Sequence, residues 1–525
     1  MEKFILAFDR ELVIAEKKDS TWSVQSQFVG ANPVALALDP YDSERMYCGT
    51  FDRGLWRSKD GGSSWEAIGT LPSFGEVFPA NAIHRKNKKK QIGLLEAGDL
   101  LLPTHGQNLP TMNIDRLLNN YFPKVATPIG KRLPQYSEAT LVFALGGRTL
   151  FWSTASPRMP TFEMEKWPVT ANEMKFYYVI AEKVMNVTPF FARGSSMQNI
   201  MLERLKKNGF PEAIDLPMAV NLKGTQQGQI GSDVFFSSIH FLAYALNWRA
   251  FDLAVNSRVV QVVIDQGRTV GVHVISPDKK SYFIRAKTVV LSTGALETPR
   301  ILLYSGIQGP AIGHYLTNHS LLRAIGQINR RNFSEELGNL VINIPQTKQS
   351  PFQIQMLGSE KYYAYQPFEE KPFLEEVKIA LNTFGKVESR FENSVYLDPT
   401  ERDEYGIPQI QVSFSYSERD NMIIQQMAQA KIQATSAMKL SLTSQENRPP
   451  ISLMSPGNDY HESGTCRMGD DPLTSATNQF GQIHGIPGLY VADNSVLPSI
   501  GAANPTLTTI ALSIRTADYI IRQLG

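Results

Sequence analysis

The chain has 525 residues, 42% of them hydrophobic, which is enough for roughly two to four globular domains and excludes a mainly disordered protein. Its formal net charge of +2 gives no electrostatic basis for binding nucleic acid. Only two cysteines, Cys48 and Cys466, are present, and no apolar run reaches the roughly 18 residues of a membrane-spanning helix. The apolar start of the chain is broken at Asp9 and Arg10, so a signal peptide is not expected. We therefore expect a soluble, cytoplasmic protein without a disulfide framework.

Residues 1–75 read as short strands separated by turn signals, and two of their segments look related. Each segment ends in a tryptophan, and Trp22 and Trp65 are 43 residues apart, close to the roughly 40–45 residues of a propeller blade. The sequence SKDGGSSW, Ser58–Trp65, resembles the Asp box of sialidase-like propeller repeats, in which Asp60 would begin a tight turn. Two repeats cannot close a propeller of roughly four to eight blades. We therefore expect a short all-β extension of propeller-blade-like repeats with a structural role.

The stretch 76–91 contains the densest basic run, HRKNKKK at 84–90. This run is either a nucleic-acid or localisation patch or, as we favour, a solvated linker or helix end. A short apolar strand at 92–95 then ends in Glu96. In a dinucleotide-binding unit, such a strand follows a G-x-G-x-x-G turn by roughly 20–30 residues and ends in an acid that binds the adenosine ribose. Residues 69–83 contain no such glycine pattern, so the expected phosphate loop is missing from this part of the sequence.

Two later turns suit a close approach of the backbone to a flat ligand. Gly146 and Gly147 stand together in the sequence ALGGRTLFWS. The apolar run 286–291 reads as a strand buried on both faces, and it meets a turn at Gly294 and Ala295. Between these turns, the segments 253–264 and 270–274 read as paired strands.

Three longer stretches have helical patterns. An apolar stripe over 174–184 predicts a core helix, and the aromatic-rich run 235–248 and the segment 418–440 also read as helices. His240, in the second of these, is expected to be structural. The rest of 325–455 alternates strand-like and polar segments, which fits an antiparallel sheet.

The residues from 461 to 510 are the richest in candidate chemistry. They begin at His461 in a polar loop and continue through a short apolar strand, 488–492, that ends in Asp493. Asn504–Thr506 then opens an apolar helix, whose first N–H groups and positive dipole end would stabilise an electron-rich ring or a developing anion. Histidine has the side-chain pKa nearest neutrality, so His461 is the candidate general base.

This C-terminal stretch resembles the signature of the glucose–methanol–choline (GMC) flavoprotein oxidoreductases, and 92–98 and 286–307 resemble earlier signatures of the family in the same order. The segment ALGGRTLFWS resembles the flavin-covering loop of its pyranose-oxidase-like members. The resemblance implies an α/β FAD-binding (Rossmann-like) domain and an α+β substrate domain on an antiparallel sheet. The implied division is 1–75 for the repeats, 76–91 for the linker, 92–160, 251–320 and 456–525 for an incomplete FAD-binding domain, and 161–250 and 321–455 for the substrate domain.

The resemblance also implies roles for single residues. His461 takes the proton of a substrate hydroxyl and Asn504 holds its oxygen, while hydride passes to the flavin. The implied cofactor-binding residues are Glu96, Gly146, Gly147, Thr149, Trp152, Val259, Gly294, Ala295, Asp493, Pro505 and Thr506. Some family members carry a histidine bonded to the flavin where this chain has Phe151, so we expect non-covalent FAD, and no metal. His319 and His484 are expected to be structural.

The rival interpretation is a cofactor-deficient pseudoenzyme or a binding protein, because the phosphate-binding glycine pattern is missing. The presence of both His461 and Asn504 argues against it. A sialidase-like hydrolase would need a complete propeller and is not expected from 75 residues. The sequence leaves the substrate open among sugars, polyols and other alcohols, and it does not identify the electron acceptor or the oligomeric state.

Overall fold

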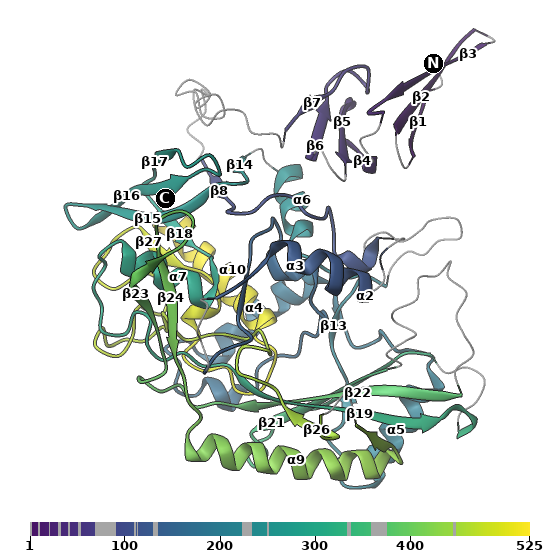
Figure 1. Ribbon diagram of the computed structural model, residues 1–525, viewed down its shortest axis with the longest axis vertical. Coiled ribbons are helices and arrows are strands. Elements are labelled where there is room, and N and C mark those ends of the chain that lie inside the picture. The colour runs from purple at the N-terminus through teal and green to yellow at the C-terminus, as the bar shows by residue number, and fades with distance from the viewer. Residues whose placement is uncertain are drawn as a thin grey trace.

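The structure of the protein is a computed structural model (Figure 1). The residues that it describes are 3–8, 11–19, 21–29, 33–39, 42–50, 54–68, 91–109, 112, 114–129, 135–222, 234–248, 251–332, 338–358, 375–444 and 448–524. The basic run 84–90 and the stretch 69–83 lie outside these ranges, so what the sequence predicts for them stays a prediction. Within the described ranges, no helix combines the length and the apolar character needed to cross a lipid bilayer.

Two small antiparallel sheets at the N-terminus project from the main body in Figure 1. Their strands are β1 (Lys3–Phe8), β2 (Glu11–Lys18) and β3 (Thr21–Gln27) in one sheet, and β4 (Pro33–Asp39), β5 (Asp42–Thr50), β6 (Gly54–Ser58) and β7 (Glu66–Ala67) in the other. Asp60 holds the turn between β6 and β7 by accepting hydrogen bonds from the N–H and the hydroxyl of Ser64, at 2.8 and 2.5 Å. Trp65 donates from Nε1 to the carbonyl of Gly62 at 3.1 Å. The expected short strands and turn are present, and their kinship with propeller blades stays a prediction.

A seven-stranded antiparallel sheet forms the lower part of the molecule in Figure 1, in the order β12-β20-β21-β22-β19-β25, with β26 also paired to β19. Its strands are β12 (Ile214–Asp215), β19 (His319–Asn329), β20 (Leu340–Ile344), β21 (Phe352–Gly358), β22 (Glu376–Lys386), β25 (Ser441–Thr443) and β26 (Ile451–Leu453). This matches the antiparallel sheet expected within 325–455.

Helices α5 (Ser196–Lys207) and α9 (Glu418–Met438) cover one face of this sheet. Helix α9 begins with a capping box, in which Ser417 and Asp420 satisfy each other's backbone N–H groups. The alternation FQIQMLG in β21 turns Ile354 and Met356 toward the helices. Gln353 and Gln355 therefore lie on the opposite face, which is where the candidate site is built.

The other half of the main body contains two separate pairs of parallel strands and a three-stranded antiparallel sheet, besides further two-stranded antiparallel pairs. The parallel pairs are β8 (Gly93–Leu95) with β14 (Asp252–Ala254), and β18 (Val289–Leu291) with β27 (Leu489–Val491). The antiparallel sheet consists of β15 (Arg258–Asp265), β16 (Arg268–Ile275) and β17 (Ser281–Arg285). Helices α4 (Ala171–Met185), α7 (Gly294–Tyr304) and α10 (Thr506–Gln523) share one hydrophobic core with β18 and β27.

Shorter elements connect these parts. They are α2 (Ile114–Arg116), α3 (Phe122–Val125), β9 (Ala126–Pro128), β10 (Thr140–Val142), β11 (Val187–Thr188), β13 (Met218–Ala219), α6 (Ile239–Trp248), β23 (Ser394–Arg402) and β24 (Pro408–Ser413). The predicted helices at 174–184 and 418–440 are confirmed as α4 and α9. Helix α6 begins later than the predicted 235, because Asn108 binds both backbone groups of Phe235 at 2.8 Å and holds them out of the helix.

Two details of the predicted strands are wrong. The run 286–291 was expected to be buried on both faces, but the side chain of Val290 is 44% exposed. Val289 and Leu291 on the other face of β18 are buried, so among the described residues only one face of this strand is covered. The segment 253–264 is also not a single strand, because β14 pairs with β8 whereas β15 forms a hairpin with β16.

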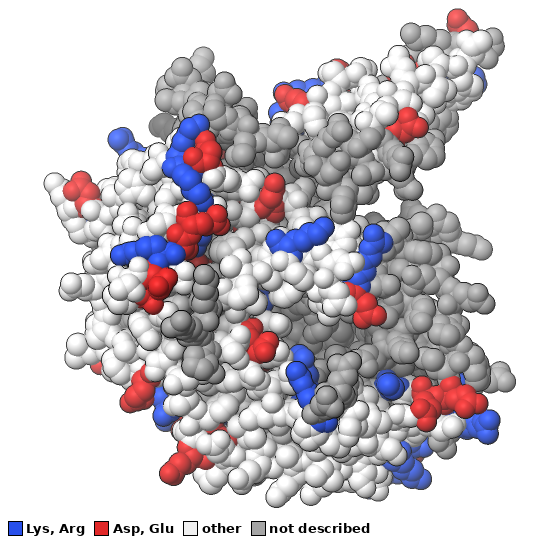
Figure 2. Space-filling view, in the orientation of Figure 1, with Lys and Arg blue, Asp and Glu red and all other residues white. Residues whose placement is uncertain are grey.

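Acidic and basic side chains are mixed on the face shown in Figure 2, and neither sign forms a continuous field among the described residues. The described part of this face therefore shows no extended basic surface of the kind that follows a phosphate backbone. Both cysteines are buried and free, which agrees with the absence of a disulfide framework.

Candidate active site

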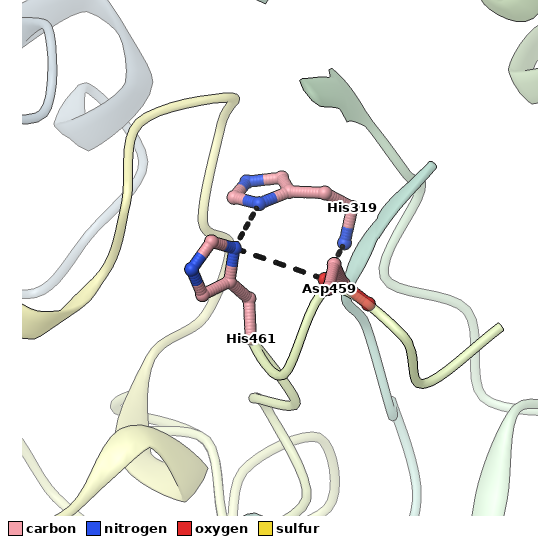
Figure 3. Close-up of side chains that lie close together, drawn as sticks. All are labelled: His319, Asp459 and His461. Carbon is pink, nitrogen blue, oxygen red and sulfur yellow. Dashed lines mark hydrogen bonds and ion pairs between the residues drawn. The ribbon is translucent and has the colours of Figure 1, made fainter. Parts of the chain in front are cut away.

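His461 lies in the loop after β26, next to His319 at the start of β19 and to Asp459 (Figure 3). The Nδ1 atoms of the two histidines are 2.8 Å apart, which is a hydrogen-bond distance. Asp459 accepts the backbone N–H of His319 at 2.8 Å, and one of its oxygens lies 3.8 Å from Nδ1 of His461. The side chain of His461 is 13% exposed, so the three groups form a nearly dry cluster.

Burial decides the protonation of this cluster. It lowers the pKa of His461 to about 3, with a smaller contribution from the positive charge of Arg148. Burial also holds the pKa of His319 well below its usual value. The pKa of Asp459 is raised to about 7 by burial and then by the nearby Glu462, against the hydrogen bonds that it accepts. Both imidazole rings are therefore neutral at neutral pH, as a general base must be before it takes a proton.

His319, Asp459 and His461 also offer three possible metal-ligand atoms within 4.8 Å of one another. Two ring nitrogens bound to one zinc ion at roughly 2.0–2.1 Å in tetrahedral geometry would lie farther apart than the 2.8 Å found here. The observed distance instead fits a hydrogen bond between one N–H and one lone pair.

Asn504 is held in a fixed orientation on the same face of the large sheet. Its amide oxygen accepts hydrogen bonds from Gln353 at 3.0 Å and from Gln355 at 2.5 Å. The register of β21 and β22 pairs Gln353 with Phe384, whose ring centroid lies 5.4 Å from that of His461. Paired residues share a face of a sheet, so both predicted catalytic residues lie against the same two strands. The amide nitrogen of Asn504 has no hydrogen-bond acceptor within the described part of the chain.

Asn504 leads directly into helix α10, whose first residue is Thr506. Pro505 has helical dihedral angles and no side chain caps the first turn, although Asn504 and Pro505 are buried. The first N–H groups of a buried helix normally find partners. This helix start therefore has donors and a positive dipole end available to a ligand.

Asp493 joins the end of β27 to the start of α7. One of its oxygens accepts the N–H of Gly294 at 2.9 Å and the hydroxyl of Thr298 at 2.6 Å, and the other accepts the N–H and the hydroxyl of Ser495 at 2.8 and 2.6 Å. The carboxylate is thus occupied by this chain itself. Gly294, with φ +88°, faces open space where a Cβ would be, and Ala295 is buried behind it.

Glu96 follows β8 directly, as the sequence predicts. Its backbone continues the pairing to β14 through the carbonyl of Ala254, at 2.9 Å, and its Oε1 accepts the N–H of Gly98 at 2.7 Å. Burial raises the pKa of Glu96 to about 7. Val259 lies half-buried on β15.

The segment 146–152 forms a tight turn against the entry to α6. Gly146 and Gly147 have φ of +99° and +53°, which suits glycine alone at low cost. The hydroxyl of Thr149 donates to the carbonyl of Gly146 at 2.5 Å and accepts the N–H of Ser238 at 2.9 Å. Trp152 donates from Nε1 to the carbonyl of Phe236 at 2.8 Å. The polar atoms of Thr149 and Trp152 are therefore used to hold this turn in place.

A cavity of about 330 Å³ is lined in part by Gln353, a hydrogen-bond partner of Asn504, and by Ala503, which precedes Asn504 in the chain. Arg158 and Glu182 line it as an ion pair with two 2.6 Å contacts. Asn343 also lines it, and its buried Oδ1 has no partner among the described residues. The cavity thus combines apolar walls with polar groups, as small-molecule sites do.

Sequence reasoning missed four side chains that contact the predicted pair. His319 was expected to be structural, and Asp459, Gln353 and Gln355 were not singled out. A signal was present for the glutamines, because two of them alternate with apolar residues in a strand that is otherwise hydrophobic.

Comparison with known proteins gives a consistent result. Two sequence profiles described as GMC oxidoreductase match the chain, one over residues 130–321 and the other over 389–513, which contains His461 and Asn504. C-glycoside 3-oxidase of Arthrobacter globiformis is 29% identical over 404 residues, covering 72% of this chain and 74% of that protein. Pyranose 2-oxidase of Tricholoma matsutake is 22% identical over 428 residues, covering 73% of each.

The fold has a solved counterpart as well. The crystal structure of pyridoxine 4-oxidase from Mesorbium loti superposes with a TM-score of 0.56 and covers 85% of this chain and 96% of that one, at 14% identity. This likeness concerns the fold alone. The two profiles together cover more than half of the chain, at the positions of the candidate catalytic pair, and the chain therefore belongs to the GMC oxidoreductase family.

Proposed function

We propose that this enzyme, an oxidoreductase acting on CH–OH donors, oxidises a sugar or a related alcohol with FAD as its cofactor, His461 as general base and Asn504 as hydrogen-bond donor. The observation that carries the proposal is the joint placement of His461 and Asn504 over one face of β21 and β22. A neutral imidazole and an oriented amide against one surface suit removal of a hydroxyl proton.

The residues present fit FAD at three points. The uncapped start of α10, at Pro505 and Thr506, would face an electron-rich ring or an anion. Gly294 leaves open space beside the start of α7, and the carboxylate of Glu96, one oxygen of which accepts the N–H of Gly98, would also accept from a ribose hydroxyl. Gly146, Gly147 and Val259 complete the proposed contacts, with Asp493 and Ala295 holding the turn behind Gly294. When bound, FAD supplies the acceptor for a hydride.

The roles of the protein side chains follow from their hydrogen bonds. His461 receives the hydroxyl proton of the substrate on a ring that burial keeps neutral. Asn504 donates from Nδ2 to the same oxygen, because Gln353 and Gln355 already occupy its amide oxygen. A preorganised donor of this kind stabilises the negative charge that develops as the proton leaves.

A sugar is the favoured substrate class. Two of the relatives are named as oxidases of a C-glycoside and a pyranose, and a third, 29% identical over 315 residues, is 2-methyl-1,2-propanediol dehydrogenase of Mycolicibacterium austroafricanum. The cavity beside Gln353 offers polar groups to several hydroxyls. Non-covalent attachment of FAD is proposed because Phe151 offers no nucleophilic atom and its ring packs against Phe122, 5.2 Å between centroids.

The first test is the visible absorbance spectrum of the purified chain with and without added FAD. Two flavin bands, bleached anaerobically by a sugar or alcohol, would support the proposal, and loss of this bleaching in His461→Ala would assign the base. Denaturation should release the flavin if it is not covalently bound. A chain that takes up no FAD would favour the pseudoenzyme, which the missing glycine pattern in 69–83 supports.

A further inference from the structure

The contact between His319 and His461 has a direction, because a hydrogen bond between two neutral imidazoles needs one N–H and one lone pair. Their Nδ1 atoms are 2.8 Å apart, so one of the two must carry the proton. The choice matters for catalysis. If His319 donates, the proton of His461 sits on Nε2 and that atom is no base, whereas if His319 accepts, Nε2 of His461 keeps its lone pair.

The surroundings of His319 favour the second case without fixing it through a hydrogen bond of their own. Its ring is buried and its Nε2 has no hydrogen-bond partner among the described residues, but the backbone carbonyls of Gly501 and Ile500 favour a proton on the ring. A carbonyl oxygen can only accept a hydrogen bond. Since Nδ1 of His319 faces His461, a proton favoured by these carbonyls belongs on Nε2, which leaves Nδ1 as an acceptor.

His461 must then donate from Nδ1. Asp459 agrees with this direction, since its carboxyl oxygen lies 3.8 Å from the same Nδ1 atom and would be attracted to an N–H there. In Figure 3 the second ring nitrogen of His461 points away from both His319 and Asp459. That nitrogen is Nε2, and of the two ring nitrogens of His461 it is the one that remains outside the cluster and can meet a substrate.

We propose that His319 is a positioning residue that fixes His461 in the tautomer with a proton on Nδ1 and a lone pair on Nε2. Asp459 supports it by fixing the backbone of His319 through the 2.8 Å hydrogen bond to its N–H. This inference rests on the proposed function, because it explains why His461 is a base. A serine protease triad uses the same principle, in which loss of the tautomer-setting carboxylate costs roughly 10⁴-fold in kcat.

The tautomer can be measured directly by nitrogen-15 NMR of the histidine-labelled chain, with and without FAD. The chain has 8 histidines, and the signals that disappear in His461→Ala and His319→Asn assign the two rings. We expect a protonated Nδ1 and an unprotonated Nε2 for His461 in both states. A proton on Nε2 of His461 would overturn the inference, whatever the enzyme activity.

Two matched variants test the consequence for catalysis. In His319→Asn the amide oxygen takes the place of Nδ1 as acceptor, whereas His319→Leu has a similar size and no acceptor. We expect His319→Asn to keep kcat within about fivefold, and His319→Leu to lose about 10²-fold or more with KM changed by less than about threefold. Equal kcat values for His319→Leu and the wild type would refute the positioning role.

The same experiments separate this inference from the proposed function. If His461→Ala reduces bound flavin as fast as the wild type, His461 is not the base and the proposed function fails. If His461→Ala is inactive and His319→Leu is fully active, only the inference fails. Should His319→Leu not fold, the NMR measurement on the wild-type chain still decides the tautomer.

Discussion

Replacing Gln355 by glutamate should make the rate of flavin reduction depend on the protonation of the introduced side chain. In the wild type, Gln355 and Gln353 each donate to Oδ1 of Asn504. A net contribution of roughly 0.5–1.5 kcal/mol for each hydrogen bond gives a preference of about 5- to 150-fold for the orientation with Nδ2 directed away from them. In Gln355→Glu, the protonated acid still donates to Oδ1, but the carboxylate repels Oδ1 and attracts Nδ2.

The rate should therefore fall as the pH rises through the pKa of the introduced acid. Position 355 is 2% exposed, so burial should raise that pKa above its usual value near 4.3. Loss of one donor to a developing oxyanion costs about 10²–10³-fold, which sets the expected drop between low and high pH. Gln355→Leu keeps the hydrogen bond from Gln353, and we expect it to lose less than about tenfold at any pH.

The assay is anaerobic reduction of the bound flavin, followed by stopped-flow absorbance over a pH range with the best alcohol from the screen. Wild type and Gln355→Leu are the controls, because neither has an ionisable group at this position. If Gln355→Glu has the rate and pH profile of the wild type while Asn504→Ala is impaired, the orientation of the Asn504 amide is not what Gln355 controls. A parallel drop in Gln355→Leu would indicate a general loss of packing instead.

The remaining predictions concern cofactor binding and stability. Burial raises the pKa of Glu96 to about 7, and a carboxylate accepts hydrogen bonds from ribose hydroxyls more strongly than a neutral acid does. The dissociation constant of FAD should therefore rise as the pH falls below about 7. In titrations of Glu96→Gln with FAD, the dissociation constant should not depend on pH in this way. Asp493→Asn should lower the free energy of unfolding, measured with denaturant, by about 2–4 kcal/mol. Each oxygen of Asp493 accepts two hydrogen bonds, and the substitution replaces one of these oxygens by an NH₂ group that cannot accept them. Lys431 of α9 is fully buried, donates to two backbone carbonyls at 2.6 and 3.0 Å, and has a pKa well below its usual value. Folding therefore favours the neutral form of Lys431, and the free energy of unfolding should decline as the pH falls below about 10. The melting temperature of Lys431→Met should not show this decline. Identical pH profiles for the wild type and Lys431→Met would contradict the prediction.

The sequence was informative wherever one short stretch contains all the residues that determine a feature. The start of α9 follows from Ser417 and the acid three residues later, and the start of α10 follows from the proline at 505. His461 and Asn504 could be named because the loop and the helix start that carry them lie in one C-terminal stretch. Their placement against the same two strands, β21 and β22, could not be derived, since it depends on the register of strands that lie far earlier in the chain.

The missed residues have a common cause. His319 and His461 are 142 residues apart, and the pairing of β19 with β26, together with the bridge between Thr317 and Ser463, brings them together. No local pattern around His319 distinguishes a positioning residue from a structural one, because the difference lies in which ring nitrogen meets an acceptor. Val290 was misjudged for a similar reason, since an apolar strand does not reveal whether a layer will cover it.

The two parallel pairs have a consequence for how the chain folds during synthesis. Strand β8 can pair only after its partner β14, about 160 residues later, has been synthesised. Strand β18 can pair only after β27, which is 200 residues later and close to the C-terminus. Closing loops of this length is slow, because the entropy of the loop is lost before the strand contacts form. The large sheet, whose four central strands are all made by residue 386, can assemble on the ribosome while β18 still exposes Val290 and an unpaired edge. A ribosome that stalls after the large sheet would thus release a chain with an open strand edge, which is the form most prone to pair with another chain.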